Sequence, residues 1–224
     1  MILAYIQNVM IASSLPISRF GRIICVLCIS VLLAACGGSE VPQTTPGPFA
    51  EFVKDIELSN QSDPIAIVET DVGTFGIELF NVQMPTSVAH FVKNVSEQRY
   101  ENSLVYNVAS GFAAYMGDKS GALKEPGDVT PLSLETHPDI KHDAAGIVGF
   151  VHETGSRCTT APNPEECAKS ALNSAKTFFY VTLNAQPSLD NVYAPFGRVA
   201  KGLEIVRNLK KGNKITKITV VQRQ

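Results

Sequence analysis

Short apolar segments separated by polar turns follow one another along the chain from residue 65 to its end. Residues 65–70 and 75–80 flank a turn that contains Gly73, a pattern typical of a β-hairpin. Further segments have the length and the apolar content of strands: 103–108, 112–116, 147–151, 178–183, 194–199 and 215–221. The last of them alternates apolar and polar residues, as a half-buried strand does.

Two other segments have the helical period instead. A helix is predicted to begin at Pro85, because apolar residues then recur at i, i+3, i+4 and i+7. These residues are Val88, Phe91, Val92 and Val95. A second helix is predicted to carry Leu203, Val206 and Leu209 on one face and to end at Gly212. Many short strands with two helices indicate a closed antiparallel barrel or a sandwich, with the helices as lids.

An uncharged apolar run, 23–35, follows Arg19 and Arg22 near the start of the chain. It is shorter than the roughly 20 residues that span a bilayer, but it suits the apolar region of a signal peptide. The run leads into Leu-Ala-Ala-Cys36, which resembles a bacterial lipobox, a signal in which the cysteine is acylated. We therefore expect lipid on Cys36, since two or three acyl chains hold a protein firmly in a membrane. A simple secretory signal and a signal anchor are the alternatives.

The expected organisation is a lipoprotein signal peptide over 1–35, an acylated anchor and tether over 36–62, and one domain over 63–224. The tether is assigned from its Gly, Ser and Pro residues. We expect an exported protein that is anchored in a membrane through Cys36 and faces the periplasm. For a bacterium with two membranes, Gly37 in place of an aspartate after the cysteine resembles the pattern of outer-membrane lipoproteins and favours the outer membrane over the inner one.

The net charge and the positions of the cysteines limit the ligands and bonds that are expected. The net charge of −2, without a sustained basic tract, gives no footprint for nucleic acid, and we expect none to bind. Cys158 and Cys167 flank a short Pro-rich loop, and in an oxidising compartment they are predicted to form a disulfide. A metal site there would need two more ligands, and none lies at suitable spacing, so no metal is expected. His137 and His142 are interpreted as ordinary surface residues.

An ordered set of motifs over about 64–221 resembles the cyclophilin family of peptidyl-prolyl cis-trans isomerases. The motifs are, in chain order, Val68-Glu69-Thr70-x-x-Gly73-Thr74, Pro85-Thr86-Ser87-Val88-x-x-Phe91, Gly111-Phe112 with Gly117-Asp118, Lys141-His142-Asp143, Phe178-Phe179 with Thr182-Leu183, and Phe196-Gly197-Arg198-Val199. The resemblance implies a mainly β fold, a closed eight-stranded antiparallel β-barrel capped by two α-helices. It also implies a monomeric protein that needs no cofactor. Its substrates would be proline-containing segments, in this case of exported proteins.

The resemblance places the family's catalytic arginine at Asn107. Rotation about an X–Pro bond meets a barrier of roughly 18–20 kcal/mol, and a donor near the prolyl nitrogen favours the twisted state. Asparagine is shorter than arginine and uncharged. Loss of one preorganised charged donor costs on the order of 100- to 1,000-fold in rate. We therefore expect weak isomerase activity, with Arg157 as an alternative donor.

The other substrate-binding positions also follow from the resemblance. They are Phe112, Ala113, Tyr115, Val151, His152, Phe178, Tyr180, Leu189 and Tyr193. Tyr115 stands where the family has glutamine, and Tyr193 stands where it has histidine. The positions of Phe178 and Tyr180 assume a register in which Phe179, Val181 and Leu183 face the core. The aromatic residues either line a groove or fill vacated volume. Three functions stay open: a slowed isomerase, a non-catalytic proline- or peptide-binding lipoprotein, and a scaffold lipoprotein.

Overall fold

The computed structural model describes residues 47–222, except the side chain of Arg157. Its strands form a closed barrel in the order β1-β2-β7-β5-β6-β4-β3-β8, and each pair of neighbours is antiparallel. The strands are β1 (Ile65–Thr70), β2 (Gly73–Leu79), β3 (Ser103–Ala109), β4 (Ala113–Asp118), β5 (Ile147–Phe150), β6 (Phe179–Thr182), β7 (Pro195–Lys201) and β8 (Lys214–Val221). The barrel is the closed alternative of the two architectures predicted from the sequence.

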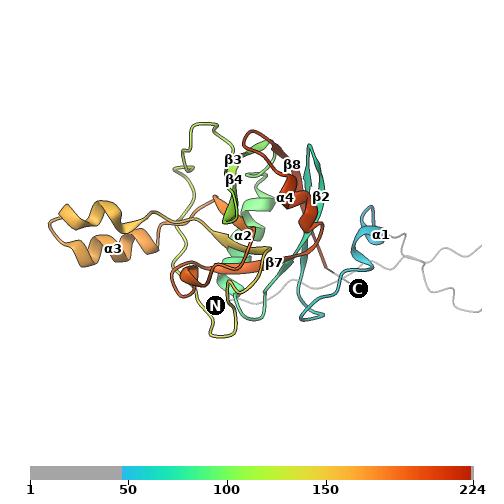
Figure 1. Cartoon of the computed structure of the whole chain (residues 1–224), viewed down its shortest axis with the longest axis horizontal. Helices are drawn as coiled ribbons and strands as arrows, with labels where there is room; N and C mark the ends of the chain where they lie inside the picture. The colour runs from blue at the N-terminus through green and yellow to red at the C-terminus, as the bar shows by residue number, and fades with distance from the viewer. Residues whose placement is uncertain (1–46, 223–224) are drawn as a thin grey trace, which may run out of the picture. The chain divides into compact units, whose positions relative to one another are not determined.

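Helical segments connect and cover these strands (Figure 1). They are α1 (Ala50–Val53), α2 (Pro85–Ser96), η1 (Gly155–Thr160), α3 (Pro164–Leu172), η2 (Pro187–Leu189) and α4 (Leu203–Asn208), of which η1 and η2 are 3₁₀ turns. In α2 the predicted apolar face packs inward, with Phe91 fully buried and its ring 4.9 Å from that of Phe196. None of the helices in the described part of the chain is long and apolar enough to cross a bilayer.

The second predicted helix ends earlier than its apolar period indicated. Helix α4 stops at Asn208, and Leu209 leaves it with extended backbone angles, φ −61° and ψ 142°. Leu209 nevertheless remains buried, because its side chain packs in the barrel core. The following turn places Gly212 so that its N–H donates to the carbonyl of Val105, which directs the chain into β8.

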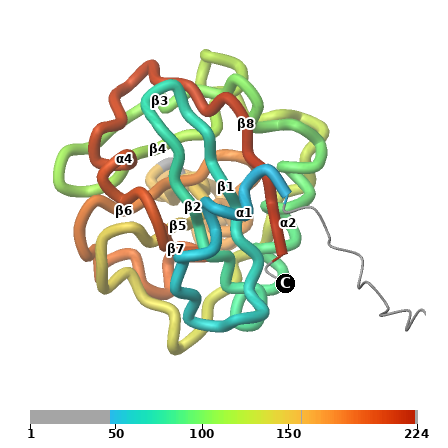
Figure 2. Tube along the Cα trace, turned by 90° about the vertical axis from the view of Figure 1, so that its right-hand side faces the viewer, coloured from blue at the N-terminus to red at the C-terminus, as the bar shows by residue number. Residues whose placement is uncertain are grey.

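Strand β1 is buried on both faces. Ala66 and Val68 belong to the barrel core, whereas Ile65 and Ile67 form a second cluster with Ile56 and Leu58. Alternate side chains of a strand point to opposite faces, so the 47–62 segment must cover the outer face of β1. Figure 2 shows this segment, which includes α1, crossing in front of β1 and β2. The described part of the tether expected over 36–62 is therefore packed against the barrel, because its apolar residues complete this cluster.

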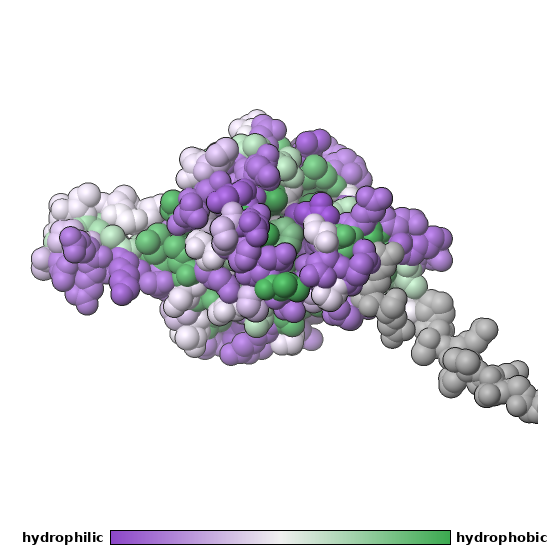
Figure 3. Space-filling model, turned by 90° about the horizontal axis from the view of Figure 1, so that it is seen from below, coloured by the Kyte–Doolittle hydropathy of each residue, from purple (hydrophilic) through white to green (hydrophobic). Residues whose placement is uncertain are grey.

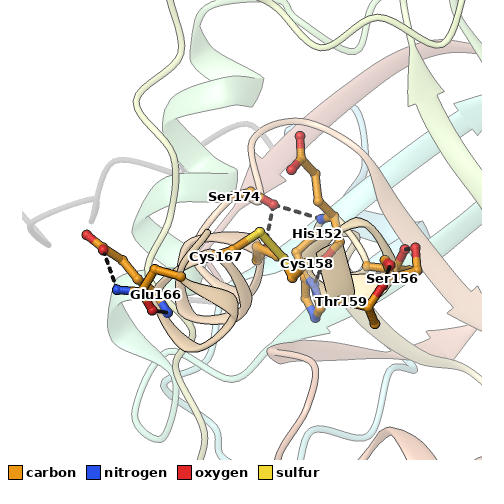
Figure 4. The surroundings of a disulfide bond; sticks show 11 residues. His152, Ser156, Cys158, Thr159, Glu166, Cys167 and Ser174 are labelled. Atoms are coloured by element: carbon orange, nitrogen blue, oxygen red, sulfur yellow. Dashed lines mark hydrogen bonds between the residues drawn. A yellow bond between two sulfur atoms is a disulfide. The ribbon is translucent and has the colours of Figure 1, made fainter. Parts of the chain in front are cut away.

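The predicted disulfide is present, with the Cα atoms of Cys158 and Cys167 5.4 Å apart. It joins η1 to α3 in a segment that projects from the barrel (Figure 1). The sequence pattern predicted only a Pro-rich loop here, whereas the structure has helix α3. Its start signals are local, since Asn163 accepts a hydrogen bond from the backbone N–H of Glu166 and Pro164 occupies the first turn. Figure 4 shows the bridge between the two helical turns.

Candidate functional site

A row of side chains crosses the outer face of β3, β4 and β6. The register pairs Asn107 with Tyr115, and Tyr115 with Tyr180. Directly opposed residues of antiparallel strands share a face, so these three side chains lie side by side. The register assumed from the sequence for β6 is confirmed, because Phe179, Val181 and Leu183 belong to the core.

A β-bulge in β3 gives Asn107 its place on this face. The pairing with β4 shifts between Val105 and Asn107, which leaves Tyr106 as the extra residue. Val105 points into the core and is fully buried. Strict alternation would then place Asn107 on the core face as well, but the bulge turns it outward, and it is exposed. A bulge has no signal in this strand's sequence, so the pattern alone could not show it.

Ring contacts connect the aromatic side chains of this face into one band, which we call the aromatic row. Its centroid distances are 5.0 Å for Phe178–Tyr106, 6.0 Å for Tyr106–Tyr115, 6.2 Å for Tyr115–Tyr180, 5.8 Å for Tyr180–Tyr193 and 4.2 Å for His152–Tyr193. These separations are in or near the range of favourable aromatic pairs. The structure therefore brings five of the sequence-predicted positions together and adds Tyr106.

Burial keeps the phenols of the aromatic row uncharged. It raises the pKa of Tyr106, Tyr115 and Tyr193, and it raises the pKa of Tyr180 well above its ordinary value. The row therefore presents a neutral aromatic surface with hydroxyl groups, at any pH near neutrality.

No guanidinium reaches the row from the arginines whose side chains the structure describes. Arg99 pairs with Glu97 and Asp128, Arg198 pairs with Glu78, and Arg207 lies in α4. The alternative donor considered from the sequence, the side chain of Arg157, lies outside the described part. The Asn107 amide makes no hydrogen bond with any described residue, so it is free to donate to a ligand.

His142 is a buried residue, which corrects the interpretation of it as a surface side chain; it is 0% exposed. Its Nδ1 lies 2.9 Å from a carboxylate oxygen of Asp190, and its Nε2 lies 2.7 Å from the hydroxyl of Tyr180. The sequence pattern could not show this, because Asp190, which directly follows η2, and Tyr180 of β6 are 48 and 38 residues away along the chain. His137, the other member of the pair, remains partly exposed.

The protonation of this network follows from its partners. A carboxylate only accepts hydrogen bonds, so the ring proton of His142 lies on Nδ1 and points at Asp190. Burial lowers the pKa of His142, although Asp190 acts in the opposite direction, and the ring is therefore neutral near pH 7. Nε2 must then accept the hydrogen bond from Tyr180, whose hydroxyl proton is no longer available to a ligand.

Gly149 allows the ring of Tyr180 to lie across β5. A Cβ atom at this position would come within 2.6 Å of the Cζ atom of Tyr180 and 3.1 Å of the Ala194 carbonyl oxygen. Such approaches are far inside van der Waals contact, so only glycine fits without a shift of the ring. The position of the Tyr180 ring is thus fixed by the hydrogen bond of its hydroxyl to His142 and by its close packing on Gly149.

The remaining predicted positions lie around the aromatic row. Ala113 is fully buried opposite Thr182, while Phe112 and Leu189 are half-buried. The Leu189 carbonyl accepts from the backbone N–H of Tyr193, so η2 places that ring. The ring of Phe112 makes no contact with the rings of the row in the described part of the chain.

Val151, His152 and Phe178 come together in a cleft of about 560 Å³ beside the row. Residues from the end of α3 and from the 123–131 segment also line this cleft. Both ring nitrogens of His152 lie within hydrogen-bonding distance of backbone carbonyl oxygens, 2.7 Å from that of Glu153 and 2.9 Å from that of Val192. Among the described residues, no group of His, Cys, Asp and Glu side chains is arranged to hold a metal ion.

Comparison with known proteins gives a consistent picture. Residues 65–223 match the family model described as cyclophilin type peptidyl-prolyl cis-trans isomerase/CLD. Peptidyl-prolyl cis-trans isomerase CYP18-2 of Arabidopsis thaliana is 26% identical over 150 residues, 66% of this chain and 81% of the relative. A peptidyl-prolyl cis-trans isomerase of Synechococcus elongatus is 26% identical over 159 residues, 70% of this chain and 95% of the relative.

Solved structures show the same fold. The chain is similar to a Cryptosporidium parvum cyclophilin type peptidyl-prolyl cis-trans isomerase crystallised in the presence of the dipeptide Ala-Pro, with a TM-score of 0.58 and 23% identity. That match covers 71% of this chain and 99% of the other. Cyclophilin AquaCyp293 from Hirschia baltica matches with a TM-score of 0.56 and 20% identity, over 71% of this chain and 74% of the other.

Proposed function

The chain belongs to the cyclophilin-type peptidyl-prolyl cis-trans isomerase family, and on this premise we propose that it isomerises X–Pro bonds of exported proteins, with weak activity. The observation that carries the proposal is the position of Asn107, which stands on the outer face of the barrel beside the aromatic row. Its amide is a free donor next to an apolar surface that suits a proline ring. The relative crystallised with Ala-Pro supports a proline-containing ligand.

The weakness of the activity follows from the chemistry of the donor. Isomerisation requires that the twisted, pyramidal prolyl nitrogen be bound better than the planar amide. The Asn107 amide can donate to that nitrogen, but it has no charge and a shorter reach than a guanidinium. Tyr180 cannot replace it, since its hydroxyl proton is held by His142. A rate about 100- to 1,000-fold below that of an arginine-bearing site is expected.

A non-catalytic peptide-binding protein is the second candidate, and the aromatic row favours it. Aromatic rings hold proline by area burial and do not require a charged donor. In this case the protein would bind proline-containing segments through the same face and leave their isomerisation rate unchanged. The two candidates differ only in the rate, so one assay separates them.

We also propose that the protein is anchored in the cell envelope as a lipoprotein, with lipid on Cys36. The residues that carry this proposal, 1–46, lie outside the described part of the structure. Its support is the apolar run that ends in Leu-Ala-Ala-Cys36, together with a disulfide, which is typical of oxidising compartments. Cys36→Ser should move the protein from the membrane to the soluble fraction or leave it uncleaved. A cleaved variant that stays in the membrane fraction would contradict the anchor.

The central experiment compares wild type with Asn107→Arg in an isomerisation assay on a short Ala-Pro peptide. A slow wild type and a faster variant, by about tenfold or more, are expected because the guanidinium restores the charged donor. Asn208→Arg, at an exposed position of α4, is the matched control and should leave the rate unchanged. A wild type as fast as arginine-bearing cyclophilins would refute the assignment of Asn107. Binding of the peptide without any acceleration would select the second candidate.

A further inference from the structure

A segment without any acidic residue concentrates positive charge at the end of the fold, although the net charge of the chain is −2. We call its cationic residues the basic strip, and they are Arg207, Lys210, Lys211, Lys214 and Lys217. All of them are exposed, and none forms an ion pair with a residue that the structure describes. Positive charge that the protein itself leaves unpaired favours an anionic partner.

A β-bulge in β8 places the two lysines of this strand on the same face. The register between β8 and β1 skips Thr216, whose hydroxyl donates to a backbone carbonyl of β1 at 3.0 Å. Ile215 and Ile218 therefore both reach the barrel core, while Lys214 and Lys217 are both exposed. In a regular strand, residues three apart point to opposite faces. The bulge thus gathers the two charges on the outer face of the barrel.

Three carboxylates border the basic strip without neutralising it. Glu69 lies opposite Lys217 in the sheet, Asp71 follows in the next turn, and Glu204 is in the first turn of α4. In the described part of the chain, none of these carboxylates forms an ion pair with a cation of the strip. The strip has more cations than there are carboxylates beside it, so this face keeps an excess of positive charge.

The chain reaches the barrel close to this face. Phe49, near the start of the described part, packs in the same cluster as Val221 of β8. Figure 2 shows α1 beside β8. The residues 37–46 that separate Cys36 from this point span at most roughly 40 Å when fully extended. Lipid on Cys36 would therefore keep β8 near the membrane surface.

We infer that the basic strip binds the phosphate groups of anionic phospholipids in the membrane that holds the lipid anchor. The choice of a membrane as the partner rests on the proposed anchor. The contact is electrostatic, because the exposed residues between 207 and 217 are Arg, Asn, Lys, Gly and Thr, with no apolar side chain to insert. By contrast, the face seen from below in Figure 3 has hydrophobic residues among the hydrophilic ones. Such binding would orient the barrel on the membrane, which a lipid on a tether alone does not do.

The test measures how fast lysines of the full chain react with an amine-acylating reagent, read by mass spectrometry. The protein is incubated with vesicles of phosphatidylcholine, with or without phosphatidylglycerol. Lys211, Lys214 and Lys217 should react about fivefold more slowly with the anionic vesicles, and high salt should remove this protection. Lys93 of α2 and Lys169 of α3 are exposed lysines outside the strip and should react equally with both vesicles. Inorganic phosphate in place of vesicles should protect none of them.

Two double variants with the same loss of charge show whether the strip is responsible. Lys214→Gln combined with Lys217→Gln should restore the reactivity of Lys211 with anionic vesicles, whereas Lys93→Gln combined with Lys169→Gln should leave Lys211 protected. Equal reactivity of the strip with both vesicles, equal effects of the two double variants, or protection by inorganic phosphate would each overturn the inference.

The same vesicles separate this inference from the proposed anchor. A protein that binds only the anionic vesicles, with its strip protected, would contradict the lipid anchor and support the inference. A protein that enters both kinds of vesicle with its strip unprotected would support the anchor and overturn the inference. Binding to neither kind of vesicle would contradict both.

Discussion

Tyr180→Phe tests how much the buried hydrogen bond between Tyr180 and His142 contributes to the stability of the fold. The substitution removes only the hydroxyl that donates to Nε2 of His142, at 2.7 Å. The ring of Tyr180 is 2% exposed, and His142 is 0% exposed, so water cannot replace the lost donor without a rearrangement. Nε2 becomes a buried acceptor without a partner.

The cost follows from that unpaired acceptor. A buried polar group left unsatisfied costs roughly 1–3 kcal/mol, more than the net worth of an ordinary hydrogen bond. We take about 2 kcal/mol as the expected loss in the free energy of unfolding. For a domain of this size, 1 kcal/mol shifts the thermal midpoint by roughly 2–4 °C, so a fall of about 4–8 °C is expected.

Urea unfolding and thermal unfolding at pH 7 measure the effect, with Tyr193→Phe as the matched control. Tyr193 lies on the same row and is half-exposed, and its hydroxyl bonds to no residue that the structure describes. Its substitution should change the free energy of unfolding by no more than about 0.5 kcal/mol. Equal losses in the two variants would refute the network described for His142.

Three further outcomes are expected. The free energy of unfolding should fall as the pH is lowered from 7 to 5, because burial lowers the pKa of His142 and the unfolded chain, with a histidine pKa of about 6.5, takes up the proton first. In His142→Gln, the free energy of unfolding measured with urea should fall less steeply over the same pH range. An unchanged dependence on pH would contradict the assignment to His142. Replacing Cys158 and Cys167 by serine should lower the local stability of η1 and α3 by roughly 2–3 kcal/mol. Amide exchange should become faster in η1 and α3 but not in the barrel, because α3 packs mainly on η1. An equal acceleration of exchange in the barrel strands would contradict a local effect of the disulfide. Gly149→Ala should cost about 1–3 kcal/mol in chemical denaturation, because its Cβ would displace the Tyr180 ring; a neutral result would mean that the ring can move freely.

Much of the barrel could be predicted from the sequence because its signals are local. Alternating apolar residues, the turn at Gly73 and the helical period after Pro85 gave strand and helix positions close to those observed. The disulfide was also predictable, since its two cysteines lie 9 residues apart. The presence of asparagine at position 107, where the resemblance places the family's arginine, can be read directly from the sequence.

Other features depended on contacts between distant segments. The sequence predicted the 47–62 segment to be part of a tether. In the structure its Ile56 and Leu58 pack on the apolar residues of the outer face of β1. The start signals of α3 were present in the sequence, but a short stretch between cysteines also fits a loop. Local pattern could not show the packing of 47–62, because its stabilising partner, β1, lies outside that segment.

The amino-acid sequence supplies the side chains of the site, and the closed barrel sets their directions and their partners. The barrel placed Asn107 on the outer face through the bulge at Tyr106, because strand pairing rather than alternation sets the direction of a side chain at a shifted register. It also buried His142 between Asp190 and Tyr180, which come from segments far along the chain. Hydrogen bonds across such separations exist only once the barrel has closed, so no pattern of neighbouring residues can contain them.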